Sequence, residues 1–156
     1  MDNKYAYLIS AYTEPDTLVH LVNSLDNNAD FFIHIDKKTD LKKFQEPLLG
    51  KKNVYFVKDR VKVFWGGYSQ VILQQKLIKE MLNTNREYKK VINLSGTDYP
   101  VYSNDVLHFA FDRDVEYIMG FDVIHEEGHG KNKEKMITKF SRYHHMDTNK
   151  YVRAFF

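Results

Sequence analysis

The stretch Tyr5-Ala-Tyr-Leu-Ile-Ser-Ala11 decides the fold class, because it is an almost continuous run of apolar residues. Such a run is typical of a strand that is buried on both faces of a parallel sheet. A helix start follows, with Thr13 as the expected cap and Pro15 in the first turn. Apolar residues recur at helical spacing as far as Leu25, and Phe31–Ile35 reads as a second strand. Strand, helix and strand in this order predict a right-handed, parallel βαβ unit.

Further apolar segments, separated by turn residues, continue this alternation along the chain. Their spacing predicts a short helix around 41–49, a strand over 54–57, an extended piece over 61–65, a helix over 68–82, a strand over 88–94, a helix over 104–111 capped by Asn104, and a strand over 116–119. We therefore expect a single α/β domain over residues 1–156, with helices flanking a mostly parallel sheet. The segment 136–156 mixes aromatic and basic residues without a clear closing element, so we expect the domain to continue beyond this sequence.

The composition excludes several classes of protein. The 23 basic and 21 acidic residues nearly balance, which argues against a nucleic-acid-binding protein that relies on neutralising phosphates. The absence of cysteine excludes disulfides and thiolate metal sites. The first residues lack the apolar run of a signal peptide, and no segment reaches the roughly 20 apolar residues of a membrane span. We therefore expect no transmembrane segment, and a cytoplasmic protein that reaches the inner membrane face only through partners.

One candidate ligand-binding loop follows the strand that ends at Leu94. This strand looks buried, it runs into Ser95-Gly-Thr-Asp98, and Pro100 prevents a helix there. In an α/β sheet, ligands bind at the loops that leave the carboxyl ends of strands. Gly96 permits a close backbone approach, and Asp98 brings a carboxylate to the strand end. The alternative is an ordinary strand turn closed by a capping Asp.

A second candidate lies at the end of the strand Phe31–Ile35. Asp36 follows this strand directly, and an acid in that place can accept hydrogen bonds from a nucleotide base or ribose. Its basic neighbour Lys37 could then meet a phosphate. The alternative is a surface turn with a capping Asp.

The third candidate surrounds the single tryptophan of the chain, Trp65. Gly66 and Gly67 follow it, and Ser69 lies near the start of the long predicted helix. Two glycines before a helix let backbone N–H groups face an anion or a carbonyl. The alternative is a core tryptophan beside a flexible turn. The phosphate-binding loop and the glycine-rich dinucleotide motif are both absent from the sequence.

Support for a metal site or a nucleophile is weak. Asp112-Arg-Asp114 has the spacing with which some sugar-nucleotide enzymes hold a divalent cation, but acidic residues are expected between a helix and a strand. Glu126 and Glu127 form the only paired carboxylates late in the chain and belong to no motif. We expect no metal and no other cofactor.

Taken together and in order, four stretches resemble a known family. The stretches are Ala6-Tyr-Leu-Ile-Ser-Ala-Tyr12, Phe32-Ile-His-Ile-Asp-Lys-Lys38, Arg60 with Trp65-Gly-Gly-Tyr-Ser69, and Asn93-Leu-Ser-Gly-Thr-Asp-Tyr-Pro100. They are similar to those of glycosyltransferase family 14, the core-2/I-branching β-1,6-N-acetylglucosaminyltransferases and peptide O-xylosyltransferases. The lack of a membrane anchor resembles the bacterial branch of this family. The resemblance implies a GT-A-type, Rossmann-like nucleotide-sugar fold, an inverting mechanism and no required metal.

The resemblance also implies a set of binding residues at the strand ends. They are Ala11, Tyr12 and Asp36, with Lys37, for the uridine nucleotide; Arg60, Trp65, Gly66 and Ser69 for the shape of the nucleotide pocket; and Gly96 and Asp98 beside the sugar and diphosphate. Tyr12 departs from the family pattern, in which many members carry His. Family members also continue for roughly another hundred residues, and that part carries the catalytic base and the cations that neutralise the leaving UDP. We therefore expect the base to lie beyond Phe156.

Two functions follow as hypotheses. The first is the N-terminal, nucleotide-sugar-binding part of a UDP-sugar-dependent inverting glycosyltransferase, which transfers N-acetylglucosamine from UDP-GlcNAc to a hydroxyl of a glycan or polysaccharide. The second is a truncated, non-catalytic UDP-sugar-binding or interaction module.

Overall fold

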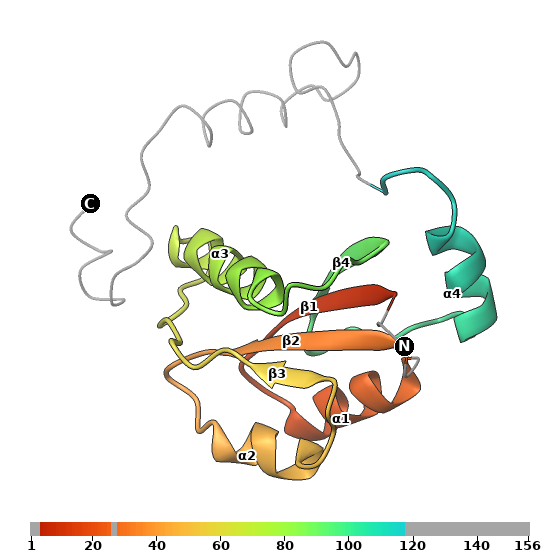
Figure 1. Cartoon of the computed structure of the whole chain (residues 1–156). Helices are drawn as coiled ribbons and strands as arrows, with labels where there is room; N and C mark the ends of the chain where they lie inside the picture. The colour runs from red at the N-terminus through yellow and green to blue at the C-terminus, as the bar shows by residue number, and fades with distance from the viewer. Residues whose placement is uncertain (1–3, 26–27, 118–156) are drawn as a thin grey trace, which may run out of the picture.

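The computed structural model describes residues 4–25 and 28–117, and it has the α/β architecture expected (Figure 1). Its elements are β1 (Tyr5–Ala11), α1 (Pro15–Ser24), β2 (Ala29–Ile35), α2 (Lys42–Gln45), the 3₁₀ helix η1 (Glu46–Leu48), β3 (Val54–Phe56), α3 (Ser69–Leu82), β4 (Lys90–Ser95) and α4 (Asn104–Phe111). The four strands form one parallel sheet in the order β3-β2-β1-β4. The predicted βαβ unit is therefore confirmed, and β1 lies inside the sheet.

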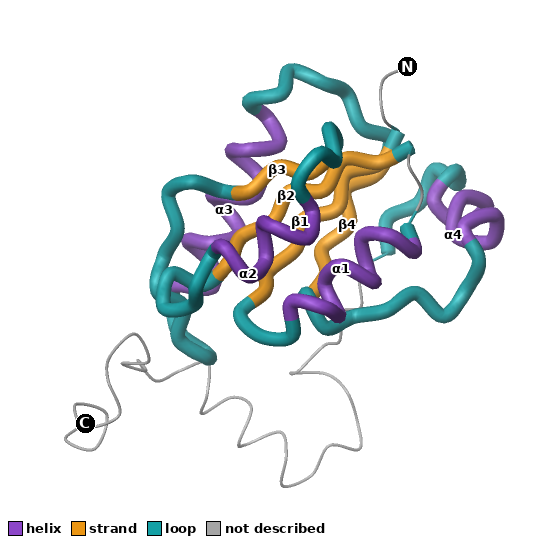
Figure 2. The backbone as a smooth tube through the Cα atoms, turned by 90° about the horizontal axis from the view of Figure 1, so that it is seen from below, coloured by secondary structure: helices purple, strands orange, loops and turns teal. Residues whose placement is uncertain are grey.

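Helices cover both faces of the sheet. Helices α1 and α2 lie on one face and α3 on the other, as Figures 1 and 2 both show. All seven residues of β2 are buried, and β1 is buried at every position except Ser10, which is half-buried. Two covered faces explain why these two strands are continuous apolar runs rather than alternating ones.

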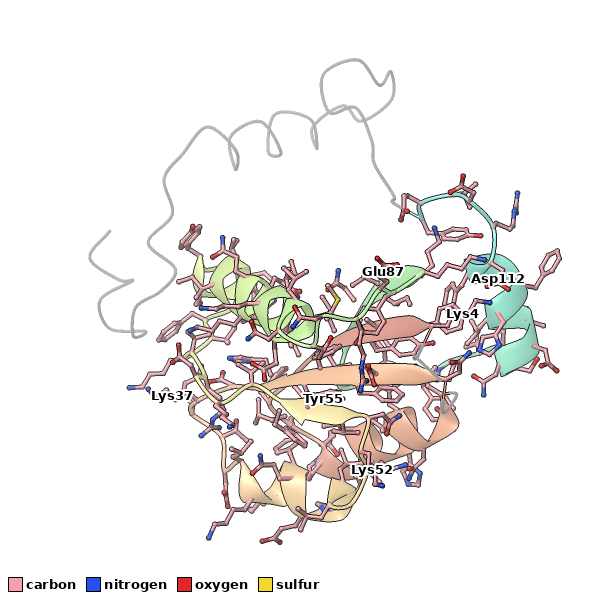
Figure 3. All side chains as sticks on the ribbon, in the orientation of Figure 1. Lys4, Lys37, Lys52, Tyr55, Glu87 and Asp112 are labelled. Atoms are coloured by element: carbon pink, nitrogen blue, oxygen red, sulfur yellow. The ribbon has the colours of Figure 1, made fainter. Side chains whose placement is uncertain are left out.

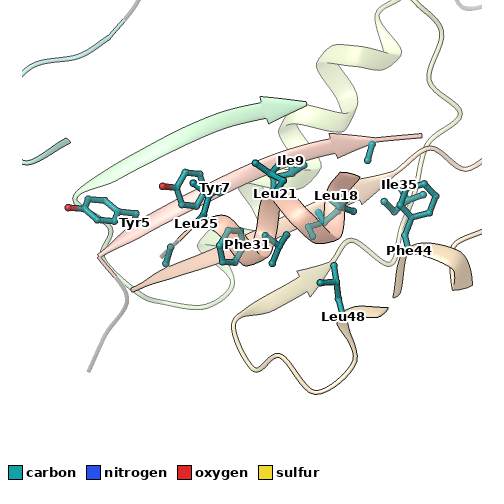
Figure 4. Packing of buried hydrophobic residues seen from close by; sticks show 14 residues of the cluster. Tyr5, Tyr7, Ile9, Leu18, Leu21, Leu25, Phe31, Ile35, Phe44 and Leu48 are labelled. Atoms are coloured by element: carbon teal, nitrogen blue, oxygen red, sulfur yellow. The ribbon is translucent and has the colours of Figure 1, made fainter. Parts of the chain in front are cut away.

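The larger core lies between the sheet and α1, α2 and η1 (Figure 4). Odd-numbered residues of β1 and β2 point to this face, and the rings of Tyr7 and Phe31 stack at a centroid distance of 5.3 Å. Leu18 and Leu21 of α1 pack against them, and each is almost completely buried. The same face also takes up Leu107 and other side chains of α4.

The smaller core lies between the sheet and α3. Phe32 of β2 packs there with Leu73 and Leu77 of α3. A buried charge, Asp30, lies near the start of β2. Asp30, which is fully buried, accepts hydrogen bonds at Oδ2 from Arg86 Nη1 and from the hydroxyl of Tyr88, both at 2.6 Å. Burial, together with the bond to Asp30, raises the pKa of Tyr88 to about 12. These partners satisfy a carboxylate that would be costly to bury alone.

One expectation about β4 was wrong. Its residues were expected to be buried, but burial alternates along the strand, and Val91 is 44% exposed. The reason is that β4 has β1 as its only neighbour among the described strands, while α3 packs on β1 and β2. The side chains of β4 that face the α3 side are therefore not covered by that helix.

The helix caps also differ from expectation. Helix α1 does begin at Pro15, but the capping position is Glu14, which has a left-handed φ of 53°, and no side chain caps the helix. Thr13 is therefore not the cap. Ser103 occupies the capping position of α4, and Asn104 instead donates from Nδ2 to the carbonyl of Ser24 at 3.2 Å, which ties α4 to the end of α1.

Two predicted extended segments are not strands where the structure describes them. Residues 61–65 form a loop without ladder pairing. Glu116 and Tyr117 carry no regular structure, and the rest of the strand predicted over 116–119 lies outside the described residues.

Candidate ligand-binding cavity

A cavity of about 360 Å³ opens at the carboxyl edge of the sheet, on the face that carries α3. Its lining comes from β1, β2 and the end of β4, from the loops that follow β1 and β2, from the loop 57–68 and from the first half of α3. The lining residues are Ser10, Ala11, Tyr12, His34, Asp36, Lys38, Val63, Trp65, Gln70, Leu73 and Ser95. This is the edge where ligands bind in open α/β sheets.

Three polar side chains from neighbouring strands form the floor of the cavity. Ser10 of β1 is in register with His34 of β2 and with Ser95 of β4. Residues in register on adjacent strands point to the same face, so the three side chains form one polar row. With strands about 4.8 Å apart, the row is about 10 Å long. The sequence motifs did not indicate this row, because it depends on strand pairing.

Asp36 stands beside this row and is 6% exposed. Its Oδ1 accepts the backbone N–H of Lys38 at 2.9 Å and that of Val63 at 3.4 Å, and its Oδ2 lies 3.3 Å from Lys38 Nζ. The carboxylate therefore lines the cavity and also fixes the loop that forms one cavity wall. This position of Asp36 is compatible with both interpretations made from the sequence, namely a hydrogen-bond acceptor for a ligand and a turn residue.

Lys38 rather than Lys37 is the basic residue at the cavity. Its Nζ donates to the carbonyl of Val63 at 2.5 Å and lies 4.7 Å from the centre of the Phe64 ring. Lys37 is exposed, and Figure 3 shows its side chain pointing outward from the body of the protein. The expectation that Lys37 meets the ligand is not supported by this placement.

The residues around Trp65 shape the cavity mainly by fixing its loop. Arg60 does not line the cavity, and its Nη1 donates to the carbonyls of Asp36 at 3.2 Å and Thr39 at 3.0 Å. Ser69 is buried, and its Oγ accepts the N–H of Phe64 at 2.9 Å.

Trp65 itself lines the cavity and is 82% exposed, so it is not a core tryptophan. Gly66, the next residue, has a φ of 72°, which favours glycine at this turn. Tyr12, on the loop after β1, is also an exposed aromatic residue of the lining. Exposed rings at a cavity are suited to stacking on a flat ligand.

The loop after β4 approaches β1 closely. Gly96 donates its N–H to the carbonyl of Ser10 at 2.8 Å, and a Cβ built on Gly96 would lie only 2.4 Å from Ala11 Cβ. Asp98 accepts the N–H of Ser95 at Oδ2, at 2.7 Å, as in the turn interpretation. Asp98 lines a second hollow, of about 120 Å³, with Leu107 and other residues on the opposite face, and does not line the main cavity.

His34 is the buried ionisable residue that the motif analysis did not select. Burial is the main cause that lowers its pKa, and Asp36 opposes the shift. The ring is therefore neutral near pH 7. Among the lining residues, the charges of Asp36 and Lys38 compensate each other, and the remaining side chains are neutral. The cavity is thus suited to a neutral polar group such as a nucleoside, and a diphosphate would need further cations.

Neighbouring residues engage the side chain of Asp112, from the acidic pair Asp112 and Asp114. Asp112 Oδ1 accepts the Tyr5 hydroxyl at 2.9 Å and lies 2.5 Å from Lys4 Nζ, and Figure 3 shows Lys4 and Asp112 close together. These partners lower the pKa of Asp112 far below its ordinary value. Within residues 4–25 and 28–117, no three His, Asp or Glu side chains are grouped as metal ligands would be. In the same residues, none of the helices is long and apolar enough to cross a membrane. Glu126 and Glu127 lie outside the described residues.

The chain is similar to a known enzyme family and to several named transferases. The model of the Core-2/I-Branching enzyme family matches residues 5–155. Xylosyltransferase oxt of Drosophila melanogaster is 28% identical over 114 residues, and xylosyltransferase 2 of Homo sapiens is 28% identical over 114 residues; in each case the match covers 70% of this chain and 12% of the relative. The human protein named probable beta-1,3-galactosyl-O-glycosyl-glycoprotein beta-1,6-N-acetylglucosaminyltransferase 7 is 25% identical over 113 residues, which cover 69% of this chain and 26% of the relative. The chain thus spans only a small part of the length of these relatives.

Proposed function

Because the chain belongs to the Core-2/I-Branching enzyme family, we propose that its cavity binds the nucleoside part of a UDP-sugar. The observation that carries this proposal is the assembly of separate sequence motifs around one cavity. Four of its lining residues come from these motifs, at the carboxyl edge of a parallel sheet: Ala11 at the end of β1, Tyr12 after it, Asp36 after β2 and Trp65 before α3.

The charges and rings of the cavity fit a uridine nucleotide. The carboxylate of Asp36 can accept a hydrogen bond from a base N–H or a ribose hydroxyl, and the polar row offers further partners. Trp65 and Tyr12 offer exposed rings on which a base can stack. The diphosphate would extend past Ser95 toward the loop that holds Gly96 and Asp98.

For the whole protein we propose an inverting transfer of a sugar, N-acetylglucosamine in the first instance, from the UDP-sugar to a hydroxyl of a glycan or polysaccharide. The acceptor oxygen would attack the anomeric carbon from the face opposite UDP, while the bond to UDP breaks and its electrons pass to the diphosphate. A carboxylate base would take the proton of the acceptor hydroxyl. Basic side chains, rather than a metal, would stabilise the departing charge. We place the base and these cations in the part of the protein that follows this sequence.

The donor sugar and the cellular place are further parts of the proposal. Relatives named for xylosyl transfer and for N-acetylglucosaminyl transfer both match the chain, so UDP-xylose is the alternative donor. We propose a cytoplasmic protein of the bacterial branch, peripheral to the inner membrane.

A non-catalytic UDP-sugar-binding or interaction module is the second candidate function. It is favoured by one observation, namely that among the described residues the cavity lining holds a single carboxylate, Asp36, and that this group is engaged by Lys38 and Val63. A group held in this way is poorly placed to act as the general base.

Calorimetry on the 156-residue chain tests the binding proposal. UDP, UDP-GlcNAc and UDP-xylose should each bind at one site, and CDP and GDP should bind more weakly. The variant Asp36→Asn should lose about tenfold in UDP affinity, as expected when a charged hydrogen-bond partner becomes neutral. Lys37→Ala is the matched control on the adjacent exposed residue and should bind as the wild type does. The absence of UDP binding at millimolar concentration in a folded sample would refute the proposal. A UDP-release assay should find little or no turnover by this chain.

A further inference from the structure

The two ring nitrogens of His34 differ in their hydrogen bonding. The side chain lines the cavity and is 1% exposed. Its Nε2 accepts the backbone N–H of Val61 at 3.0 Å, so the ring proton of the neutral form resides on Nδ1. Nδ1 is buried, and within residues 4–25 and 28–117 it has no hydrogen-bond partner. The geometry therefore determines which tautomer the neutral ring adopts.

The bond from Val61 holds one end of a cavity wall. We name the segment Val61–Trp65 the wall segment, because it brings Val63 and Trp65 to the cavity lining. Its N–H groups are bound by residues at the carboxyl end of β2, Val61 by His34 and Val63 by Asp36. The wall segment has no strand pairing in the described structure. Its carbonyls accept the backbone N–H of Lys37 at Val61, at 2.9 Å, and Lys38 Nζ at Val63, at 2.5 Å, so the bond from Val61 to His34 is one of several that hold it and the one that depends on the protonation of a ring.

We propose that His34 is a positioning residue: its neutral ring, protonated at Nδ1, holds the wall segment against β2, and protonation at Nε2 releases that segment and opens the cavity. A protonated imidazole has an N–H at both nitrogens and no acceptor. Its Nε2–H would then face the N–H of Val61, and two donors 3.0 Å apart cannot bond. Only the naming of the ligand as a uridine nucleotide rests on the proposed function, because the release of the wall segment is a property of the free chain.

Burial, more than the charged groups around it, lowers the pKa of His34 and keeps the ring neutral near pH 7. Asp36, beyond the end of β2, favours the protonated form. Arg60 from the loop after β3 and Lys76 from α3 disfavour it, and burial, the largest cause, also disfavours it. The strand on the other side, β1, presents the uncharged Ser10. The wall segment is therefore held at neutral pH, and we expect it to be released only below the ordinary titration range of histidine.

The single tryptophan of the chain makes the release measurable, because Trp65 lies in the wall segment. The Trp65 emission of the free chain should change as the pH falls, with the same midpoint as the His34 ring in a nitrogen-detected NMR titration, while far-ultraviolet circular dichroism stays constant. In His34→Gln the carboxamide oxygen can accept the Val61 N–H but does not titrate, so the transition should disappear. His20→Gln, a change at an exposed histidine on α1, should leave it unaltered.

The outcomes of this experiment are decisive. A wild-type ring that carries its proton on Nε2 at neutral pH would overturn the proposal, and so would an unaltered emission transition in His34→Gln. The tautomer is measured on the wild type, so the test holds even if the variant folds poorly.

A second set of titrations extends the test to the ligand. Wild-type affinity for uridine, which has no phosphate, should fall about tenfold per pH unit below the His34 midpoint, whereas His34→Gln affinity should be flat. UDP should show the same difference between the two proteins, although its terminal phosphate itself titrates near pH 6. If neither protein binds uridine or UDP at neutral pH, the proposed function fails, while the emission and tautomer measurements still decide the role of His34. Binding with equal pH dependence in both proteins would overturn the positioning role alone.

Discussion

The close approach of Gly96 to Ala11 predicts a steric coupling that can be measured. In Gly96→Ala the new Cβ would lie 2.4 Å from Ala11 Cβ, whereas carbon atoms in contact prefer a separation of about 3.5–4.0 Å. One of the two backbones must therefore move by about 1.1–1.6 Å, taken as the difference between these distances. Overpacking of this kind costs about 1–3 kcal/mol of unfolding free energy. The movement would also alter the edge of the cavity at Ala11 and Ser95.

A double-mutant cycle separates this clash from other effects of the substitution. Ala11→Gly removes the clashing atom and should cost about 0.5–1 kcal/mol by itself. The double variant should then recover at least about 1 kcal/mol of the loss that Gly96→Ala causes, because residues in contact are coupled by such amounts. Urea unfolding followed by circular dichroism measures all four proteins.

Gly50 provides the control for this cycle. It has a φ of 87° and no atom within 4 Å of its built Cβ, so Gly50→Ala should be destabilising through backbone strain alone. Its cost should simply add to that of Ala11→Gly. The steric reasoning is refuted if Gly96→Ala is as stable as the wild type, or if Ala11→Gly fails to rescue it.

Three further predictions follow from the described contacts. Tyr88→Phe removes a hydrogen bond to the fully buried Asp30 and should lower the unfolding free energy in urea by about 1.5–3 kcal/mol. Tyr117→Phe, at an exposed residue, should change it by less than about 0.5 kcal/mol. Equal effects of the two substitutions would contradict the role of Asp30. Lys38→Ala should weaken UDP binding about three- to tenfold in calorimetry, while Lys37→Ala should leave it unchanged, and the reverse order would show that the cation at the cavity is wrongly assigned. The pKa of His34 is lower in the folded chain than in the unfolded chain, where it is near 6.5. The neutral ring therefore contributes to the unfolding free energy at pH values above about 6.5, and this contribution is lost as the pH falls from about 6.5 toward the pKa of the folded chain. The urea midpoint of the wild type should therefore fall more between about pH 7.5 and about pH 5.5 than that of His34→Gln, and parallel curves would contradict it.

The sequence was sufficient to predict the fold because its strongest signals are local. The run Tyr5–Ala11 is apolar without interruption because β1 is covered on both faces, and this property of the sheet is visible in one strand. The burial of β4 could not be predicted in the same way. Val91 is exposed because none of the helices within residues 4–25 and 28–117 covers that strand on the α3 side, and no residue near Val91 indicates this. Capping positions were similarly uncertain, since Glu14 adopts a left-handed conformation that its residue type does not suggest.

The candidate site could be predicted only as far as single strand ends allow. Asp36 and Trp65 were found because each follows or precedes an element with a clear boundary, and both line the cavity. His34 and Ser10 were missed because their meeting depends on the register of β1 and β2. The choice between Lys37 and Lys38 depends on which side chain turns back to Val63, and this is a tertiary contact. Arg60 and Ser69 were predicted to shape the pocket, and the structure shows that they hold the loop that carries it.

The measurement that most directly tests the central claim is an NMR titration of the chain with UDP, followed residue by residue. The account predicts that the amides of Ser10, Asp36 and Trp65 shift together along one saturable curve. Those of Tyr99 and Leu107, at the hollow on the opposite face, should remain unchanged. Shifts confined to that hollow, or no saturable shift in a folded chain, would contradict the claim that the cavity at the carboxyl edge of the sheet binds the nucleotide.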